Sequence, residues 1–329
     1  MKVLFIGGTG NISISVSKLA VERGFDLYLL NRGQQDVTIP GAKTITADIH
    51  QPAQVEAALR DYHFDVVVNW IAFKEQDVEQ DIALFRGRCA QYIFISSASA
   101  YQKPVTHPVI TESTPLANPH WQYSRDKIAC EERLTRAYRE EGFPMTIVRP
   151  SHTYGTRIPT GVGSWSSYVV PKRMLEGKPV IMHGDGTSLW TVTHSDDFAL
   201  GFVGLIGHPQ ALGHAFHITS DFMQSWNQMY EQIGDALGVK PKLVYIPSDF
   251  IARVDPPSGP GLLGDKMYSV IFDNSKIKRF VPEFVATIPF HVGIRRTLAY
   301  YQAEASRMEV PAEDDAQFER ILAAYQKEA

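Results

Sequence analysis

The sequence predicts an α/β protein built on a doubly wound, mostly parallel sheet, with a smaller C-terminal lobe. Three observations carry this prediction. Short apolar runs alternate with helical patterns through the first 150 residues. The run Phe64–Asn69 is apolar almost throughout, as expected of a parallel strand buried on both faces. A glycine-rich segment, 7–13, separates the first apolar run from the first helical pattern.

The first 32 residues predict a strand, a glycine loop, a helix and a second strand. The strands are Lys2–Ile6 and Phe25–Leu30, and the helix is 14–23, with Ile14, Leu19 and Val21 as its apolar contacts. This βαβ order is typical of a dinucleotide site, because glycines let the backbone approach a pyrophosphate and the helix N-terminus attracts its charge. The pattern Gly7-x-x-Gly10-x-x-Ser13 has a serine at its third position, and the alternative is an ordinary tight turn.

The next elements extend the same alternation. They are the strand Lys43–Ala47, the helix Gln51–Tyr62, the strand 64–69, the helix Asp77–Phe85, the strand Gln91–Ser96, the helix Trp121–Glu141 and the strand Met145–Arg149. We therefore expect a Rossmann-type domain over residues 1–155.

The pattern loosens after residue 155, where loops rich in Gly, Pro, Ser and Trp separate helices at 168–176 and 225–237. We expect residues 156–329 to form mainly the smaller, substrate-binding lobe. The chain is expected to return to the first domain near 190–220, since Ala215–Thr219 reads as a further strand. Near the end, Phe318, Ile321, Leu322 and Tyr325 fall on one helical face, so the tail is expected to dock.

Composition narrows the functional class. The chain has 329 residues, 44% of them hydrophobic and 21% charged, and a formal net charge of −4, which gives no general attraction to nucleic acid or to anionic membrane. Its two cysteines, Cys89 and Cys130, are too few for a disulfide framework or a cysteine zinc site, and no metal site is predicted. No stretch approaches the roughly 20 apolar residues that span a bilayer. The simplest expectation is a cytoplasmic protein.

Tyr123 and Lys127 are the strongest candidates for chemistry. Their spacing places a phenol and an ammonium on one face of a helix, and a nearby cation lowers the pKa of a phenol. A tyrosine tuned in this way exchanges protons with a hydroxyl or carbonyl. The preceding strand ends in serines at 96, 97 and 99, where an open parallel sheet places its ligand crevice. The alternative is that Ser96 or Ser99 caps the next turn.

Together these features resemble the extended short-chain dehydrogenase/reductases, the superfamily of NAD(P)-dependent epimerases and dehydratases. The similarity covers nearly the whole chain. Its motifs are Gly7-x-x-Gly10, Asp48-Ile49, Asn69–Ala72, Ser97 with Tyr123 and Lys127, Arg149–Gly155, Gly184–Gly186, His194–Asp197 and Ile294–Tyr300.

The resemblance implies a role for each matching residue. Tyr123 is implied to be the acid/base, Lys127 to tune it and hold the nicotinamide ribose, and Ser97 to bind the reacting oxygen. The implied contacts of the cofactor are Gly7, Thr9, Gly10, Asn11, Ile12, Asp48, Ile49, Ile71, Ala72, Lys74, Pro150 and His152. Ser99 and His152 are further candidates for substrate contact, although a histidine that braces the core or a loop is an equal alternative at 152.

Three departures from the family pattern shape the function. Asn31-Arg32 replaces the acidic residue that binds the adenosine ribose in NAD enzymes, and a guanidinium suits a 2′-phosphate, so NADP(H) is favoured over NAD(H). Ala98-Ser99 replaces the Asp-Glu pair of the dehydratases, so dehydration is not expected. Trp190 stands where sugar-nucleotide enzymes carry an arginine for the diphosphate; it either stacks on substrate or packs between lobes.

A fourth departure is the short segment Phe73–Gln91, which resembles an atypical branch that includes the chloroplast stem-loop RNA-binding proteins. A non-catalytic or RNA-binding protein is therefore the alternative function. This segment also contributes to the usual dimer contact of the family, so both a monomer and a homodimer remain open. The leading hypothesis is an NAD(P)-dependent oxidoreductase or epimerase acting on a hydroxyl or keto carbon of a small molecule, a sugar or sugar derivative.

Overall fold

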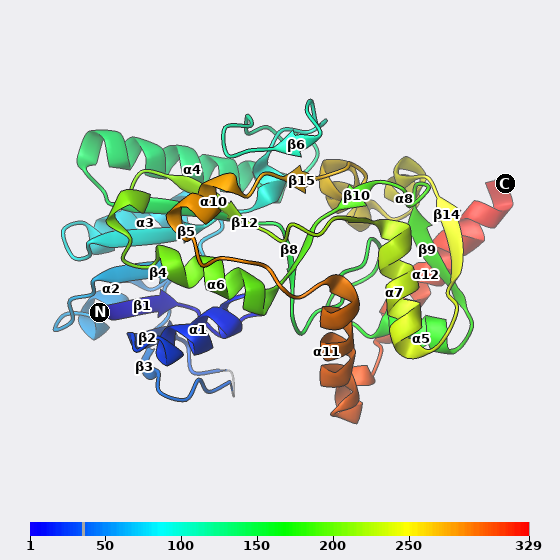
Figure 1. Ribbon diagram of the computed structural model, residues 1–329, viewed down its shortest axis with the longest axis horizontal. Coiled ribbons are helices and arrows are strands. Elements are labelled where there is room, and N and C mark those ends of the chain that lie inside the picture. Colours follow the sequence, from blue (N-terminus) through cyan, green and yellow to red (C-terminus); the bar gives the residue numbers. More distant parts are fainter. Residues whose placement is uncertain (35–36, 329) are drawn as a thin grey trace.

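A seven-stranded parallel sheet forms one end of the molecule (Figure 1). The computed structural model describes residues 1–34 and 37–328. The strand order is β12-β7-β5-β4-β1-β2-β3, which confirms the predicted doubly wound α/β fold. The strands are β1 (Lys2–Ile6), β2 (Asp26–Asn31), β3 (Lys43–Thr46), β4 (Val66–Asn69), β5 (Gln91–Ile95), β7 (Met145–Pro150) and β12 (Ala215–Ile218).

Helices cover both faces of this sheet. Val16 of α1 and Phe198 of α6 share one apolar cluster with Phe5, whereas Ile82 of α3 and Leu134 of α4 join the cluster on the opposite face. All these strands are parallel, so their carboxyl ends meet at one edge, where the loops that follow them lie close together. The helices are α1 (Ser13–Glu22), α2 (Pro52–Ala58), α3 (Glu75–Phe85), α4 (Gln122–Glu141), α6 (Ser195–Leu205) and α10 (Ser275–Phe280).

The predicted apolar residues of helix α1 lie at the edge of its buried face, and the centre of that face is formed by residues that the prediction did not name. Val16 and Ala20 are fully buried, whereas Ile14, Leu19 and Val21 are only partly buried at the edge of the cluster. The buried face also carries Ser13 and Ser17, and the Ser17 hydroxyl donates a 2.8 Å hydrogen bond to the carbonyl of Gly8. Small residues on this face therefore let the helix approach the glycine loop closely.

The remaining elements gather at the other end of the molecule (Figure 1) around a second core that contains Trp226 and Phe318. Phe318, Ile321 and Leu322 are buried, so the last helix docks as predicted. The division into domains at residue 155 stays a prediction. These elements are β6 (Val109–Ile110), β8 (His152–Tyr154), α5 (Val169–Leu175), β9 (Pro179–His183), β10 (Leu189–Trp190), β11 (Val192–His194), β13 (Gln224–Ser225), α7 (Trp226–Leu237), β14 (Lys242–Ile246), α8 (Ser248–Val254), α9 (Gly259–Gly261), β15 (Ile271–Phe272), α11 (Phe290–Gln302) and α12 (Ala312–Glu328).

Strand β12 returns the later chain to the sheet, where its residues pair in parallel with β7. This pairing confirms the predicted extra strand. Within the described residues, no helix combines the length and the apolar character needed to span a membrane.

Candidate active site

A cavity of about 1370 Å³ lies at the carboxyl edge of the sheet, between the sheet loops and the second core. Of the predicted site residues, Ala72, Lys74 and Trp190 do not line it. The others do: Gly7, Thr9, Gly10, Asn11, Ile12, Asn31, Arg32, Asp48, Ile49, Ile71, Ser97, Ser99, Tyr123, Lys127, Pro150 and His152. The topology of the sheet therefore brings together residues that lie up to 145 positions apart in the sequence.

The glycine loop after β1 forms one wall of this cavity. Gly7 and Gly8 have φ values of 91° and 99°, which side chains rarely adopt, and a Cβ on Gly8 would lie 2.8 Å from Leu29. The amide of Gly10 donates to the Ser13 hydroxyl at 2.8 Å, so the serine at the third position closes the loop onto helix α1. The positive end of α1 therefore faces an open backbone cradle, which is suited to a pyrophosphate.

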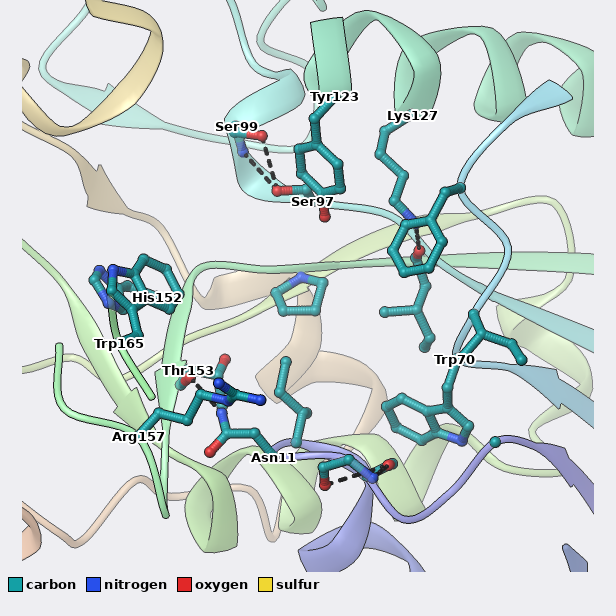
Figure 2. A pocket seen from close by; sticks show the side chains of 18 of the residues that line it. Asn11, Trp70, Ser97, Ser99, Tyr123, Lys127, His152, Thr153, Arg157 and Trp165 are labelled. Carbon is teal, nitrogen blue, oxygen red and sulfur yellow. Dashed lines mark hydrogen bonds between the residues drawn. The ribbon is translucent and has the colours of Figure 1, made fainter. Parts of the chain in front are cut away.

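Asn11 ties this loop to the segment after β7. Its side-chain amide donates to the carbonyl of Thr153 at 3.0 Å, and its oxygen accepts from the amide of Thr156 at 3.2 Å. Figure 2 shows Asn11 between the loop and Thr153, with Arg157 beside it in the cavity. Asn11 therefore fixes the position of the loop, and Arg157 adds a cation near the helix N-terminus that the sequence analysis missed.

Lys127 is held by backbone carbonyls. Its ammonium donates to the carbonyls of Ala72 (2.6 Å) and Ile95 (2.7 Å), and burial lowers its pKa to about 8. Ala72 therefore contributes its carbonyl to the lysine, and the cavity wall at this point comes from Ile71 and Phe73. These bonds fix the ammonium where strands β4 and β5 end.

Tyr123 lies beside Ser97 at the top of the cavity (Figure 2). Burial raises the pKa of its phenol, and the adjacent Ser97 hydroxyl acts in the opposite direction. The expected lowering by Lys127 is absent: the ammonium bonds carbonyls and lies 5.8 Å from the centre of the phenol ring. The spacing of four residues was read correctly, but the predicted pKa shift has the wrong sign.

Three serine hydroxyls order the end of β5. Ser97 Oγ lies 2.9 Å from Ser99 Oγ and accepts from the Ser99 amide at 3.2 Å, and Ser124 donates to Ser99 at 2.8 Å. The turn is therefore capped by Ser97, whereas Ser99 is buried behind it and Ser96 bonds Glu131. Ser97 is thus the hydroxyl placed between this network and Tyr123.

The loops after β2 and β3 line the far part of the cavity. Asn31 accepts from the amide of Gly33 at 2.9 Å and Asp48 from the amide of His50 at 3.1 Å, so both side chains shape their own turns. Arg32 is exposed at the cavity rim. Lys74 is placed elsewhere, because it is exposed at the start of α3, where its amide donates to Asp77 at 2.9 Å.

His152 is enclosed by aromatic rings. It stacks on Trp165 with ring centres 3.9 Å apart, and its Nδ1 accepts from the Trp190 indole at 3.1 Å. Trp190 is 1% exposed and packs on Trp226 behind the histidine, so it braces the core of the lobe. The suggestion that Trp190 stacks on a substrate is therefore corrected, and Trp165 is the indole that lines the cavity.

Sequence reasoning also missed Trp121, Asp265 and Lys266, which line the cavity with Trp165. They come from three separate parts of the chain, at 121, 165 and 265–266, and none follows a strand of the main sheet directly. For the residues after position 155, the sequence signal was the density of Gly, Pro, Ser and Trp in the loops there, and Trp121 had no such signal.

Comparison with known proteins fits this geometry. The profile of the NAD-dependent epimerase/dehydratase family matches residues 3–219. The chain belongs to this family. It is 23% identical to the 2'-dehydrokanamycin reductase of Streptomyces kanamyceticus over 86% of the chain and 80% of the relative. It is also 24% identical to the chloroplast stem-loop binding protein of 41 kDa b of Arabidopsis thaliana, over 76% and 67%.

Solved structures of family members share the fold. An epimerase from Methanothermobacter thermautotrophicus superposes with a TM-score of 0.75 and 15% identity over 93% of this chain and 94% of that one. The UDP-glucuronic acid 4-epimerase from Bacillus cereus was solved in complex with NAD. It superposes with a TM-score of 0.73 and 17% identity, over 92% of this chain and 99% of that one. A nicotinamide cofactor therefore suits the glycine-lined cradle of this NAD-dependent family.

Proposed function

We propose that this protein is an NAD(P)-dependent oxidoreductase or epimerase that acts on a hydroxyl or keto carbon of a sugar or sugar derivative. The observation that carries the proposal is the shared cavity: the Tyr123 phenol and the Ser97 hydroxyl lie beside each other in the same cavity as the glycine loop. A bound dinucleotide and a bound substrate would thus meet at an acid/base group.

The residues present fit the cofactor. The backbone at Gly7 and Gly8 leaves a cradle that a Cβ would strain or fill, and Arg157 places positive charge beside it. Asp48 and Ile49 would contact the adenine, and Lys127 would hold the nicotinamide ribose. When bound, the nicotinamide supplies or accepts a hydride.

Tyr123 is proposed to move the proton. Its raised pKa keeps the phenol protonated at neutral pH, ready to donate to a carbonyl oxygen that becomes a hydroxyl. In the reverse direction the same oxygen takes the proton back. Ser97 would hydrogen-bond the reacting oxygen, and Lys127, which two backbone carbonyls hold in place, would position the nicotinamide ribose beside the phenol. A reductase and an epimerase need the same three residues.

Dehydration is not part of the proposal. The dehydratases of the family carry an Asp-Glu pair at the positions of Ala98 and Ser99. Here Ala98 is buried and apolar, and the Ser99 hydroxyl is engaged by Ser97 and Ser124. No carboxylate stands at these two positions to remove and return a proton.

Arg32 supports a preference for NADP(H). Its side chain is exposed at the part of the cavity reached by the loop after β2, next to Asn31 and without an acidic neighbour at positions 31 or 33. A guanidinium there would bind the 2′-phosphate through charge-assisted hydrogen bonds.

RNA binding is the second candidate, favoured only by the similarity to the chloroplast stem-loop binding protein. The net charge of −4 opposes it. If a stem-loop RNA bound at moderate ionic strength, with affinity falling steeply as salt rises, this candidate would replace the enzyme.

The decisive test is Tyr123→Phe, measured with NADPH on a panel of keto sugars and their derivatives. We expect turnover of an identified substrate to fall about 10²- to 10⁴-fold, because the proton donor is lost, while NADPH affinity is unchanged. Tyr138→Phe is the matched control, since Tyr138 lies on the same helix and is 41% exposed. Full turnover by Tyr123→Phe would show that the phenol is not the acid/base.

A further inference from the structure

Lys266 is a buried lysine that lines the cavity. The residue is 6% exposed, and its Nζ lies 5.2 Å from the ring centre of Trp165 and 5.8 Å from that of Trp121. Burial lowers the pKa of Lys266, and the carboxylate of Asp265, which opposes this shift, accepts no hydrogen bond from Nζ within the described part of the chain. A Cβ on Gly261 would lie 3.1 Å from Nζ, so this glycine keeps the surroundings of the ammonium open.

Asp265 is already compensated by another lysine. Its Oδ1 lies 3.8 Å from Nζ of Lys103, whose side chain is fully buried beside it. One carboxylate therefore faces two ammonium groups, and the second, that of Lys266, leaves one positive charge in excess at the cavity wall. An unpaired buried charge is costly, and aromatic faces offset only part of that cost. Ionisable groups perturbed by burial cluster at functional sites, where a ligand can supply the missing partner.

His152 supplies a second unsatisfied donor on this wall. Its Nδ1 accepts from the Trp190 indole, which only donates, so the imidazole proton is on Nε2. Nε2 is buried and has no partner in the described chain. Burial and the charge of Lys266 hold the pKa of His152 well below its usual value, so the ring is neutral and offers this one N–H. Lys266 and His152 thus present donors in need of an acceptor.

We propose that Lys266 binds a carboxylate of the substrate, which makes the substrate a sugar acid or a related hydroxy or keto acid. The inference rests on the proposed function. One carboxylate neutralises a single positive charge, whereas a phosphate dianion would leave an uncompensated negative charge in a buried site, which is costly. The ring of Trp121 contacts both Lys266 and Tyr123, whose ring centre is 5.1 Å away. A carboxylate bound to Lys266 would therefore be separated from the Tyr123 phenol by the width of the Trp121 ring. A small substrate could then reach both groups at once.

The test uses full-length protein saturated with NADPH and follows tryptophan emission, since Trp121 and Trp165 flank the ammonium. Acetate is titrated against neutral acetamide at constant ionic strength, and D-glucuronate against its methyl ester. We expect each carboxylate to bind at least tenfold more tightly than its neutral partner. Lys266→Met should remove this difference, because methionine keeps the length and apolar stem of the side chain without its charge.

Lys276→Met is the matched control. Lys276 is also partly buried and bonds the carbonyl of Ala215 at 2.8 Å, but it does not line the cavity. Its replacement should leave carboxylate binding unchanged. The proposal is overturned if the neutral partners bind equally well, if no carboxylate binds, if Lys266→Met retains the difference, or if inorganic phosphate binds more tightly than acetate.

Failure of the proposed function gives a different result. The same titrations are repeated without NADPH, so the carboxylate preference is measured whether or not a cofactor binds. If NADPH does not bind, or if Tyr123→Phe keeps full turnover, the proposed redox function is rejected. A carboxylate preference that depends on Lys266 would still support the anion site. Loss of the anion preference with NADPH binding intact rejects only the carboxylate site.

Discussion

The two sides of the cavity are built in different ways. The side of the cavity proposed to bind the cofactor, called the cofactor side, is defined by residues 7–12, 31–32 and 48–49, which lie at the ends of β1, β2 and β3 or in the loops that follow them. The side proposed to bind the substrate, called the substrate side, is defined by Trp121, Trp165, Asp265 and Lys266, which come from helices and loops outside the main sheet. The positions of residues on the cofactor side follow from the order of the strands, so a local sequence motif is enough to predict them. The positions of residues on the substrate side depend on tertiary packing, which no local motif shows.

The largest expected effect is a loss of cofactor affinity caused by a substitution on the cofactor side alone. Gly8→Val should weaken NADPH binding about 100-fold, because a φ of 99° strains a β-branched residue and its Cβ would press on Leu29, which displaces the loop. Fluorescence titration with NADPH measures the change. Gly24→Val is the matched control: φ is 79°, but nothing lies within 4 Å of the added Cβ and the position is outside the cavity. Affinity in Gly8→Val within threefold of the wild type would contradict the proposed cradle.

The second prediction concerns stability in acid and rests on His183, whose Nε2 lies 3.2 Å from the carbonyl oxygen of Lys266. Burial lowers the pKa of His183 from 6.5 to about 4, so the unfolded chain binds a proton between these values while the folded protein does not. The free energy of unfolding should therefore be fully retained above pH 6.5 and fall as the pH drops toward 4. At pH 5 the loss is about 2 kcal/mol. Burial shifts His152 in the same direction.

Urea denaturation at pH 7 and pH 5, followed by tryptophan emission, measures this loss; the ring of Trp226 lies 4.8 Å from that of His183. In His183→Gln the difference between the two pH values should shrink, whatever the absolute stability of the variant. An unchanged difference would mean that other groups account for the acid sensitivity.

The third prediction tests cofactor choice. Arg32→Ser should weaken NADPH binding about tenfold, because one charge-assisted bond to the 2′-phosphate is lost. NADH has no phosphate there, so its affinity should not change, and it serves as the internal control. Competitive titration of both nucleotides gives the ratio. Equal losses for the two would show that Arg32 acts on the loop and not on the phosphate.

The smallest expected effect concerns the substrate side. Trp165→Leu should raise KM for an identified substrate about fivefold, since the indole that lines the cavity over His152 is lost. NADPH affinity should be unchanged. Steady-state kinetics and NADPH titration on the same preparation separate the two. A parallel loss of both would mean that the two sides are not independent.

Sequence patterns located the sheet well because each strand is a short apolar run that a turn interrupts. They failed where a side chain has competing partners. The spacing of Tyr123 and Lys127 was read correctly, but not that two carbonyls engage the lysine. The apolar contacts predicted for helix α1 do pack against the core, but the centre of its buried face was not predicted, because it includes serines, which an apolar count overlooks. For Trp190 the sequence left two roles open, and only burial decided between them.

Strand β12 has a consequence for biosynthesis. It is the outermost strand beside β7, yet about 65 residues separate the two along the chain. While the protein emerges from the ribosome, β7 is synthesised long before β12. Until β12 is available, the backbone groups on one edge of β7 have no partner strand. Ribosome-bound chains that end before residue 215 are therefore expected to expose an unpaired strand edge that is prone to aggregation. Binding of a chaperone should matter most while residues 151–214 are being synthesised.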